Sequence, residues 1–481
     1  MRVFGAGKRV SRFSYFLFGC AALAQLCACS GNPNGQSGER LLTQDSSLYT
    51  RVNFTSLLLD STYVVSFLDL DPKSGPVRED VRTFYQRRDY QYAWFLEDGP
   101  SRAIGIFTNL IENYATTFLD SSLLVKDVQA FVDSMQLDTA YFERAKGQIP
   151  QIELALTTLY FNYARKAYHG LDKNPRDLEW YIPRKKKNFQ LLIDKIHSPD
   201  LKPYEPVNSY YQVLKKQLIY HRKLLRTKEW NVLVMDSLPL KKADFSTALP
   251  AVKERLFDLG DFFTKDPSME FTEELASALK QFQYRNGLVA SGILNAATVM
   301  ELNRPIEERI RQMTINMERL RWLPDSFPSE FLMVNIPNFQ LLAFNEGRLL
   351  WSMPVVVGKS ATSTSIFSGI MNDVVFSPYW NVPQSIILKE LLPQIRKSPS
   401  YLEKQDMEVV SGNQVLNPYR IPWHQYRSSV PFTIRQRPGP KNALGRVKFL
   451  FPNSFSIYLH DTPYKTHFAE SKRAFSHGCI R

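Results

Sequence analysis

Cysteine is scarce in this chain of 481 residues: it has four, and three of these lie within the first 29 positions. Cys479 is the only cysteine in the remainder, and it is the third residue from the end of the sequence. A framework of intrachain disulfide bonds is therefore excluded for the body of the protein, whatever compartment it occupies.

Acidic residues are absent from the first 29 positions, which contain four basic ones, Arg2, Lys8, Arg9 and Arg12. An apolar run from Phe13 to Leu26 follows, too short and too interrupted for a comfortable membrane span. This layout is typical of an export signal. Its end, "LCACSG", resembles the bacterial lipobox with Cys29 as the lipidated cysteine, and a polar stretch suited to a flexible tether comes next. A plain secretory signal or a stray apolar N-terminus is the alternative.

Length and composition predict a folded protein of two to four domains. Apolar residues make up 44% of the chain and aromatic residues 13%, which is enough for real cores and argues against global disorder. Beyond residue 29 there are 56 basic and 47 acidic side chains. That excess favours an anionic partner, whether nucleic acid, membrane or acidic cell-wall polymer, without choosing among them.

Residues 50–245 show mostly helical spacing of apolar side chains and are predicted to form a helical scaffold domain. In "QIELALTTLYFNYARKA" the apolar residues recur at steps of three and four, which predicts one apolar stripe on an amphipathic helix. The run "RKKK" at 184–187 is interpreted as a solvated face rather than a binding patch. This half of the chain offers no evident catalytic chemistry.

Residues 246–304 form a compact module of three predicted helices, the first ending near Gly260. Thr272 and Asn295 occupy positions suited to N-caps of the second and third helices. The module resembles the three-helix peptidoglycan-binding domain, and the matching residues are Phe282, Gln283, Asn286, Gly287, Leu288, Gly292, Thr298 and Leu302. A generic three-helix bundle is an equally open reading of these residues alone.

A linking helix is predicted over 305–328, after which the pattern changes to short runs rich in Val, Ile, Phe and Trp, typical of strands. Asn345-Glu346-Gly347 has turn composition between two such runs. "KELLPQIRKSPSYLEKQ" returns to helix, and "PFTIRQRPGP", "VKFLFP" and "FSIYLHDTP" return to strand. The predicted fold class is therefore α+β and multidomain, with a mainly β domain over 329–481 and a partly helical insertion at about 385–430.

Three of the seven histidines, His460, His467 and His477, fall within the last 22 residues together with Cys479. Cysteine catalysis needs a thiolate, a base and donors for the developing oxyanion. His460 closes a predicted strand, where a rigid sheet can orient it, and Gly478 leaves room for a substrate carbonyl to approach backbone N–H groups. His467 has no assigned role.

Other readings of these residues compete. A free cysteine is often a small buried hydrophobe. A zinc site is disfavoured because the spacing H-x6-H-x9-H-x-C lacks the close ligand pairs typical of such sites. A papain-like protease would place its base far downstream of the cysteine, and only two residues follow Cys479 here.

"YLHDTP" followed by "SHGCIR" resembles the active-site motif of the L,D-transpeptidase (YkuD) family. "VNIPNFQLLAFNEGRLLWSMPVVVG", "SPYWNVPQSI" and "RQRPGPKNALGRVKFLFPN" resemble its large multidomain branch of YcbB-like enzymes. That branch combines a helical scaffold, a peptidoglycan-binding domain and a catalytic β domain with a capping insertion.

The resemblance implies a role for each residue of the motif. Cys479 would be the nucleophile and His460 the general base. Asp461 would orient the imidazole through its backbone carbonyl. Ser476, His477 and Gly478 would shape the oxyanion region, and Arg481 would position the loop or the substrate. No metal, nucleotide or other cofactor is implied.

The implied reaction is peptidoglycan cross-linking. The thiolate attacks the carbonyl that joins the diamino acid of a stem tetrapeptide to its terminal D-alanine, and the amine of a neighbouring stem resolves the thioester into a 3→3 link. Hydrolysis of cross-links and attachment of proteins to the wall remain open. The implied partners are stem peptides and, through the lipid anchor, a membrane, with no nucleic acid.

One departure from the family is substantial: family members continue past this motif with further strand and helix, whereas this sequence ends at Arg481. We therefore expect this polypeptide to be a truncated enzyme that is weak or inactive. The alternative function is a non-catalytic lipoprotein that tethers membrane to wall. The expected location is the periplasmic side of the cell envelope, and Ser30 after Cys29 mildly favours the outer membrane.

Overall fold

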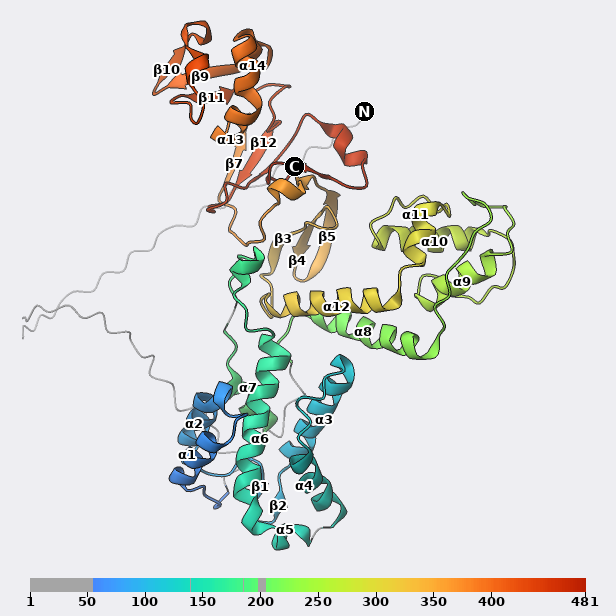
Figure 1. Ribbon diagram of the computed structural model, residues 1–481, viewed down its shortest axis with the longest axis vertical. Helices are drawn as coiled ribbons and strands as arrows, with labels where there is room; N and C mark the ends of the chain where they lie inside the picture. Colours follow the sequence, from blue (N-terminus) through green and yellow to red (C-terminus); the bar gives the residue numbers. More distant parts are fainter. Residues whose placement is uncertain (1–54, 139, 185, 198–204) are drawn as a thin grey trace, which may run out of the picture. The chain divides into compact units, whose positions relative to one another are not determined.

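The computed structural model in Figure 1 describes residues 55–138, 140–184, 186–197 and 205–481. The chain divides into two units, Met1–Val52 and Asn53–Arg481, and every described helix and strand belongs to the second. The predicted export signal, the predicted lipidation site Cys29 and the predicted tether at 30–49 lie outside the described residues. None of the helices within the described ranges is both long and apolar enough to cross a membrane.

The scaffold region is helical, as the spacing predicted, and carries one two-stranded hairpin, β1 (Phe95–Leu96) with β2 (Gly99–Pro100). Its helices are α1 (Ser61–Leu70), α2 (Arg78–Arg87), α3 (Arg102–Phe118), α4 (Lys126–Leu137), α5 (Tyr141–Arg144), α6 (Ile149–Ala164), α7 (Phe189–Ile196) and α8 (Ser209–Thr227). Helix α8 packs along α12 (Ile306–Arg321), the predicted linking helix (Figure 1).

Helix α6 differs from its predicted form. The single apolar stripe is buried, but so are residues on the other faces, including Glu153, Leu154, Thr157 and Phe161. Helices α1, α2, α4 and α7 surround α6, so it is the central helix of the scaffold core rather than an amphipathic surface helix. The Glu153 carboxylate accepts hydrogen bonds from the backbone N–H groups of Ala93 (2.6 Å) and Trp94 (3.0 Å).

The interpretation of 184–187 as a solvated face is wrong for two of its residues. The Lys187 ammonium pairs with Asp325, and its side chain is only 5% exposed. The Arg184 guanidinium lies 4.6 Å from the ring centroid of Trp322 and donates to the carbonyl of Leu171 at 3.1 Å. Both cations are held because partners far along the chain fold back onto the run, which charge composition cannot indicate.

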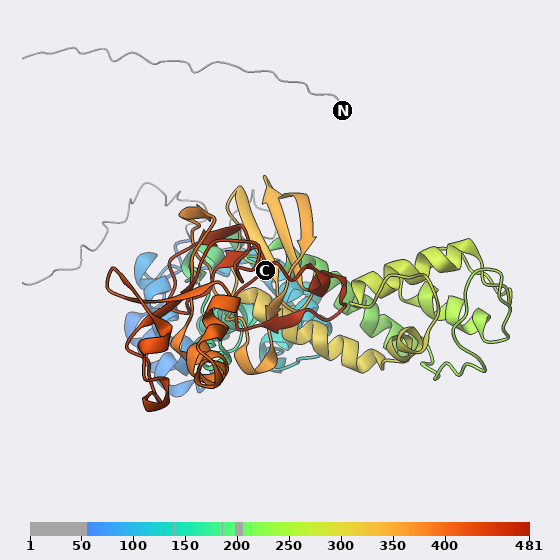
Figure 2. The same cartoon turned by 90° about the horizontal axis from the view of Figure 1, so that it is seen from above.

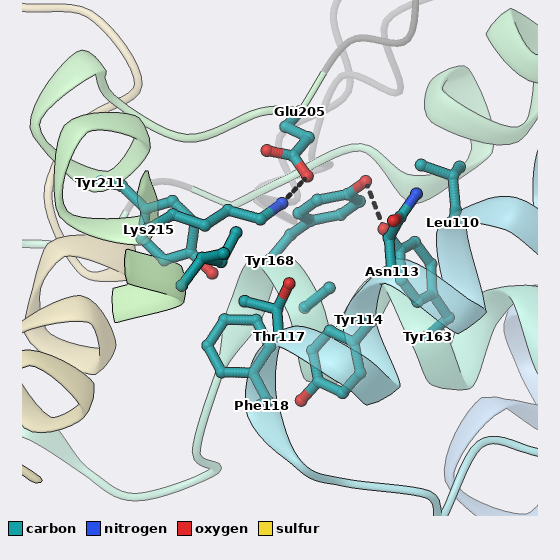
Figure 3. Close-up of a pocket in the computed structure, with 12 residues that line it drawn as sticks. Leu110, Asn113, Tyr114, Thr117, Phe118, Tyr163, Tyr168, Glu205, Tyr211 and Lys215 are labelled. Carbon is teal, nitrogen blue, oxygen red and sulfur yellow. Dashed lines mark hydrogen bonds and ion pairs between the residues drawn. The ribbon is translucent and has the colours of Figure 1, made fainter. Parts of the chain in front are cut away.

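The scaffold contains a small cavity of about 170 Å³ (Figure 3). Five of its twelve lining residues are aromatic, and two others, Lys215 and Glu205, form an ion pair at 2.7 Å. The hydroxyls of Tyr163 and Tyr168 hydrogen-bond to each other at 3.1 Å. Neither Cys479 nor His460 contributes to this cavity.

The second module has the three predicted helices, α9 (Leu249–Asp258), α10 (Glu273–Arg285) and α11 (Ala296–Leu302). Both predicted N-caps are confirmed, because Thr272 accepts from the N–H of Leu275 and Asn295 from that of Thr298. Gly260 follows α9 with φ +81°, as expected of a glycine that ends a helix. Phe282 is fully buried in this module's own core.

The β-rich region begins with an antiparallel sheet of β3 (Glu330–Asn335), β4 (Gln340–Asn345) and β5 (Arg348–Pro354), seen as one sheet in Figure 2. Glu346 and Gly347, both with positive φ, make the predicted turn between β4 and β5. A second sheet joins β7 (Asp373–Phe376), β12 (Val447–Leu450) and β13 (Leu459–His460). A parallel pair, β6 (Val357–Gly358) with β14 (Ala474–Ser476), completes the framework of the site.

The insertion is larger than predicted. It has its own sheet, in the order β10 (Gln414–Leu416), β9 (Met407–Ser411), β11 (Thr433–Gln436) and β8 (Trp380–Asn381). Helices α13 (Gln384–Ile386), α14 (Leu392–Lys397) and α15 (Ser400–Lys404) pack on this sheet, and the shared core runs from Val382 to Ile434. The strand predicted in "PFTIRQRPGP" therefore belongs to the insertion, because β11 pairs with β9 and β8 rather than with the second sheet.

Candidate active site

Cys479 is held in a tight turn that Ser476 closes. The buried Ser476 hydroxyl donates to the carbonyl oxygen of Cys479 at 2.5 Å and accepts from the N–H of Gly478 at 3.1 Å. Ser476 also ends β14, which pairs in parallel with β6. The turn is thereby fixed to a strand on one side and closed by its own side chain on the other, which sets the direction of the Cys479 side chain.

Gly478 is required here for its backbone conformation. Its φ is +118°, a value that L side chains rarely adopt. Its carbonyl oxygen accepts from the Thr364 hydroxyl at 2.8 Å, and that hydroxyl accepts in turn from the N–H of Gly358 at 2.9 Å. Sequence reasoning missed Thr364, whose buried hydroxyl links the turn to β6.

His460 lies on β13, next to the end of the turn. The N–H of His460 donates to the carbonyl of Ile480 at 2.9 Å, and Leu459 forms a parallel bridge with Ile480. Side chains alternate between the two faces of paired strands. Leu459 and Ile480 therefore point one way, whereas Tyr458, His460, Cys479 and Arg481 share the opposite face.

The His460 ring has a defined tautomer. Its Nδ1 lies 2.6 Å from the backbone carbonyl oxygen of Asp461, which can only accept, so Nδ1 carries the proton. In the neutral ring, Nε2 is then the nitrogen that can accept a proton. The Asp461 carboxylate points elsewhere: it pairs with Lys465 and accepts from the N–H of Arg446 at 3.0 Å.

The environment keeps both reacting groups uncharged at rest. Burial, together with the positive charges of Arg481 and Lys448, lowers the pKa of His460 to about 4, against the opposing hydrogen bond to Asp461. Burial raises the pKa of the Cys479 thiol, opposed by hydrogen bonding with Tyr458 and by the charge of Arg481. The resting site thus holds a thiol and a neutral imidazole, a pair suited to proton transfer during attack.

The side chains of Cys479, His477 and Arg481 have different surroundings. The Cys479 thiol donates to the carbonyl of Ser456 at 3.7 Å, and no hydrogen bond joins it to His460 in the described part of the chain. His477 turns toward the insertion, where its Nε2 lies 2.8 Å from a Glu390 carboxylate oxygen. The backbone of Arg481 is bonded in both directions to Val356, and its guanidinium Nε is buried without a partner.

Tyr458 and Trp380 are site residues that the motifs did not single out. Burial raises the pKa of the Tyr458 hydroxyl, as does its hydrogen bond with Cys479, while a bond with the Trp380 side chain lowers it. Trp380 lies on β8, so the insertion reaches the face that carries Cys479. Tyr458 lies two positions before His460, and the alternation of a strand could have placed both on one face.

A zinc site was a disfavoured alternative for these histidines and Cys479. The described residues contain no group of three or more His, Cys, Asp or Glu side chains arranged to hold a metal ion. Cys479 is a free thiol of intermediate exposure rather than a fully buried one.

Comparison with known proteins completes this picture. Residues 329–481 match the YkuD family, described as "L,D-transpeptidase catalytic domain". This chain carries a YkuD catalytic domain. Residues 79–218 match a family described as "Scaffold domain", and residues 246–302 one described as "Putative peptidoglycan binding domain". The YkuD match spans the turn, His460 and the insertion, so these features belong to one family domain.

A relative from Haemophilus influenzae, named "Putative L,D-transpeptidase", is 31% identical over 235 residues, which are 47% of each chain. The chain thus spans about half the length of this relative. Two solved structures are titled as L,D-transpeptidases. The one from Stackebrandtia nassauensis is 15% identical and covers 51% of this chain and 86% of its own, with a TM-score of 0.21. The one from Xylanimonas cellulosilytica is 14% identical and covers 52% and 88%, with a TM-score of 0.14.

Proposed function

We propose that this protein is a peptidoglycan L,D-transpeptidase that forms 3→3 cross-links through an acyl-enzyme on Cys479. The observation that carries the proposal is the bridge between Leu459 and Ile480, the chain neighbours of His460 and Cys479, within a YkuD domain. The match to a peptidoglycan-binding domain supports a wall polymer as substrate. By the predicted export signal and Cys29, the protein would act from a lipid anchor on the periplasmic side of the envelope.

In the first half-reaction, Nε2 of His460 takes the thiol proton while the Cys479 sulfur attacks the carbonyl between the diamino acid and D-alanine. The tetrahedral intermediate collapses as the imidazolium returns that proton to the leaving amine. D-alanine departs and a thioester remains. One C–N bond is exchanged for a C–S bond, without an external energy source.

In the second half-reaction, the side-chain amine of another stem attacks the thioester, and His460 accepts the amine proton. The C–S bond breaks, an amide forms, and the proton goes to the departing sulfur. Positioning of the acceptor supplies much of the rate, because an ordered amine acts at a high effective concentration. The cation Arg481 beside Cys479 favours the developing negative charge.

The test is to incubate the protein with a disaccharide-tetrapeptide and to measure released D-alanine, cross-linked dimer and the mass of the protein. In a form extended to the usual length of the family we expect D-alanine, a dimer and a thioester adduct on Cys479, and none of the three with Cys479→Ala. If neither this chain nor the extended form yields these products, although each is folded and retains Cys479, the transferase proposal fails. A protein that binds wall material equally well with and without Cys479 would then fit the tethering alternative.

A further inference from the structure

A row of side chains crosses the second sheet through His460. In the antiparallel pairing of β12 with β13, Lys448 lies directly opposite His460. Directly opposed residues of an antiparallel pair project from the same face, with Cβ atoms about 4.5–5.5 Å apart. On the other edge of β13, the parallel bridge of Leu459 with Ile480 puts Arg481 on that face as well. The imidazole is therefore flanked by two cations, Lys448 from the neighbouring strand β12 and Arg481 from the segment that bridges to Leu459.

Lys448 has no acidic partner within the described residues. Its ammonium lies 5.6 Å from the ring centroid of Tyr458, the residue whose pKa the neighbouring Cys479 helps to raise. Its backbone is part of the ladder, and its side chain is half-buried. Many other lysines differ: Lys441 pairs with Asp406, and Lys465 with Asp461.

The carboxylate nearest in sequence to His460 cannot neutralise this row. Both oxygens of Asp461 are engaged, one by the Lys465 ammonium and the other by the N–H of Arg446. The guanidinium of Arg481 likewise lacks an acidic partner among the described residues. Partly desolvated cations without counter-charges are costly unless a ligand supplies the negative charge. Such a face selects an anion beside the reacting sulfur.

We propose that Lys448 is a specificity-determining residue that binds a carboxylate of the donor stem peptide next to the scissile bond. The inference rests on the proposed function and deepens it by naming what the site recognises in its donor. Two carboxylates of a diaminopimelate-containing stem lie within one residue of the scissile carbonyl. One is on the departing D-alanine, and the other is on the side chain of the diamino acid.

Binding is measured with Cys479→Ala in the full chain, so that catalysis is not required. The probes are the tetrapeptide L-alanyl-γ-D-glutamyl-meso-diaminopimelyl-D-alanine, its C-terminal amide and the form with its diaminopimelate side-chain carboxylate amidated. We expect Lys448→Gln to weaken binding of the free acid about tenfold, the size of one charge-assisted hydrogen bond of about 1.4 kcal/mol. Lys448→Arg should retain binding within about threefold. Lys472→Gln, an exposed lysine outside the row, is the matched control and should have no effect.

Amidation identifies which carboxylate is bound. One amide should bind more weakly than the free acid when Lys448 is present, and Lys448→Gln should not weaken its binding further. The carboxylate that is amidated in that probe is the one that Lys448 contacts. An equal loss for all three probes in Lys448→Gln, or no loss for any, overturns the proposal. Thermal unfolding of each variant shows whether a loss of binding comes from misfolding. If Lys448→Gln misfolds, the affinity of Lys448→Arg for the three probes decides whether the proposal holds.

The inference and the proposed function can fail separately. In the Cys479 protein, Lys448→Gln should raise KM for the free acid about tenfold and change kcat little, because the contact forms in the ground state as well. An active enzyme with unchanged KM in Lys448→Gln refutes the role of Lys448 and leaves the transferase intact. Selective binding without any acyl-enzyme refutes the transferase and leaves the carboxylate contact intact.

Discussion

The scaffold core and the catalytic sheet both bury ionisable side chains, and the two regions satisfy them differently. In the scaffold, the Glu153 carboxylate accepts from two backbone N–H groups and from the Tyr85 hydroxyl at 2.8 Å. In the catalytic sheet, Lys448 has no acidic partner among the described residues, and the Arg481 Nε has no partner. Complete pairing makes Glu153 a structural element, whereas unused hydrogen-bonding capacity leaves the catalytic face able to bind a ligand.

The largest effect is expected at His460. His460→Gln should slow acyl-enzyme formation about 10²–10⁴-fold, since it removes the base. Because the His460 pKa is lowered to about 4, the base is neutral down to about pH 5. The wild-type rate should hold to that pH and fall as the pH drops through about 4, measured by adduct formation in stopped samples. A fall centred near 6.5 would contradict the neutral resting pair, and His467→Gln, outside the shared face, is the control.

Breaking the complete pairing of Glu153 should cost stability rather than chemistry. Glu153→Ala leaves the donors of Ala93, Trp94 and Tyr85 without their acceptor, and we expect the free energy of unfolding to fall by about 3–5 kcal/mol. Glu153→Gln retains one acceptor oxygen and should lose less. Urea unfolding measures both, and a loss below about 1 kcal/mol in Glu153→Ala would show that the network is dispensable.

The same carboxyl predicts the pH dependence of stability. Burial raises the pKa of Glu153 to about 7, above the ordinary value of 4.5, against three opposing hydrogen bonds. Between these values the folded state holds more protons than the unfolded state, so stability should fall as pH rises from about 4.5 to 7. The full change is about 3 kcal/mol. Glu153→Gln should lack this pH-dependent loss of stability. If the stability of the wild type and of Glu153→Gln changes with pH in parallel, Glu153 is not its source.

A smaller effect is expected in the peptidoglycan-binding module. Gln283 is fully buried, donates to the Ile293 carbonyl (2.8 Å) and the Thr298 hydroxyl (2.9 Å), and accepts from the N–H of Gly292 (2.9 Å). Gln283→Leu should destabilise the module by about 2 kcal/mol, because these partners stay buried. Gln281→Leu, exposed on the same helix, is the control. Equal unfolding midpoints for the two variants would show that the hydrogen bonds of Gln283 contribute no net stability.

The smallest effect is expected where an ion pair is exposed. His477 and Glu390 have side chains 36% and 52% exposed, so solvent screens their pairing. Glu390→Gln should change the free energy of unfolding by less than about 1 kcal/mol. A double-mutant cycle with His477→Gln isolates the pair. A coupling above about 2 kcal/mol would show that this contact fixes the insertion to the catalytic turn.

Local signals in the sequence determined a large part of this protein. The caps at Thr272 and Asn295, the Glu346-Gly347 turn and the strand end at His460 each depend on a few neighbouring residues, so short stretches were enough to predict them. The pairing of "YLHDTP" with "SHGCIR" was enough to indicate the family. It could not show that the His477 side chain faces Glu390.

The tertiary structure alone decided which distant residues share an environment. Helix α6 is buried on every side because other helices surround it, and Lys187 is buried because Asp325 returns to it. Lys448, His460 and Arg481 lie on one face because β12, β13 and the segment around Ile480 pair in a particular register. A shift of one residue would turn those side chains to the other face. Composition and spacing do not encode that register; it follows from how the whole sheet buries its apolar side chains.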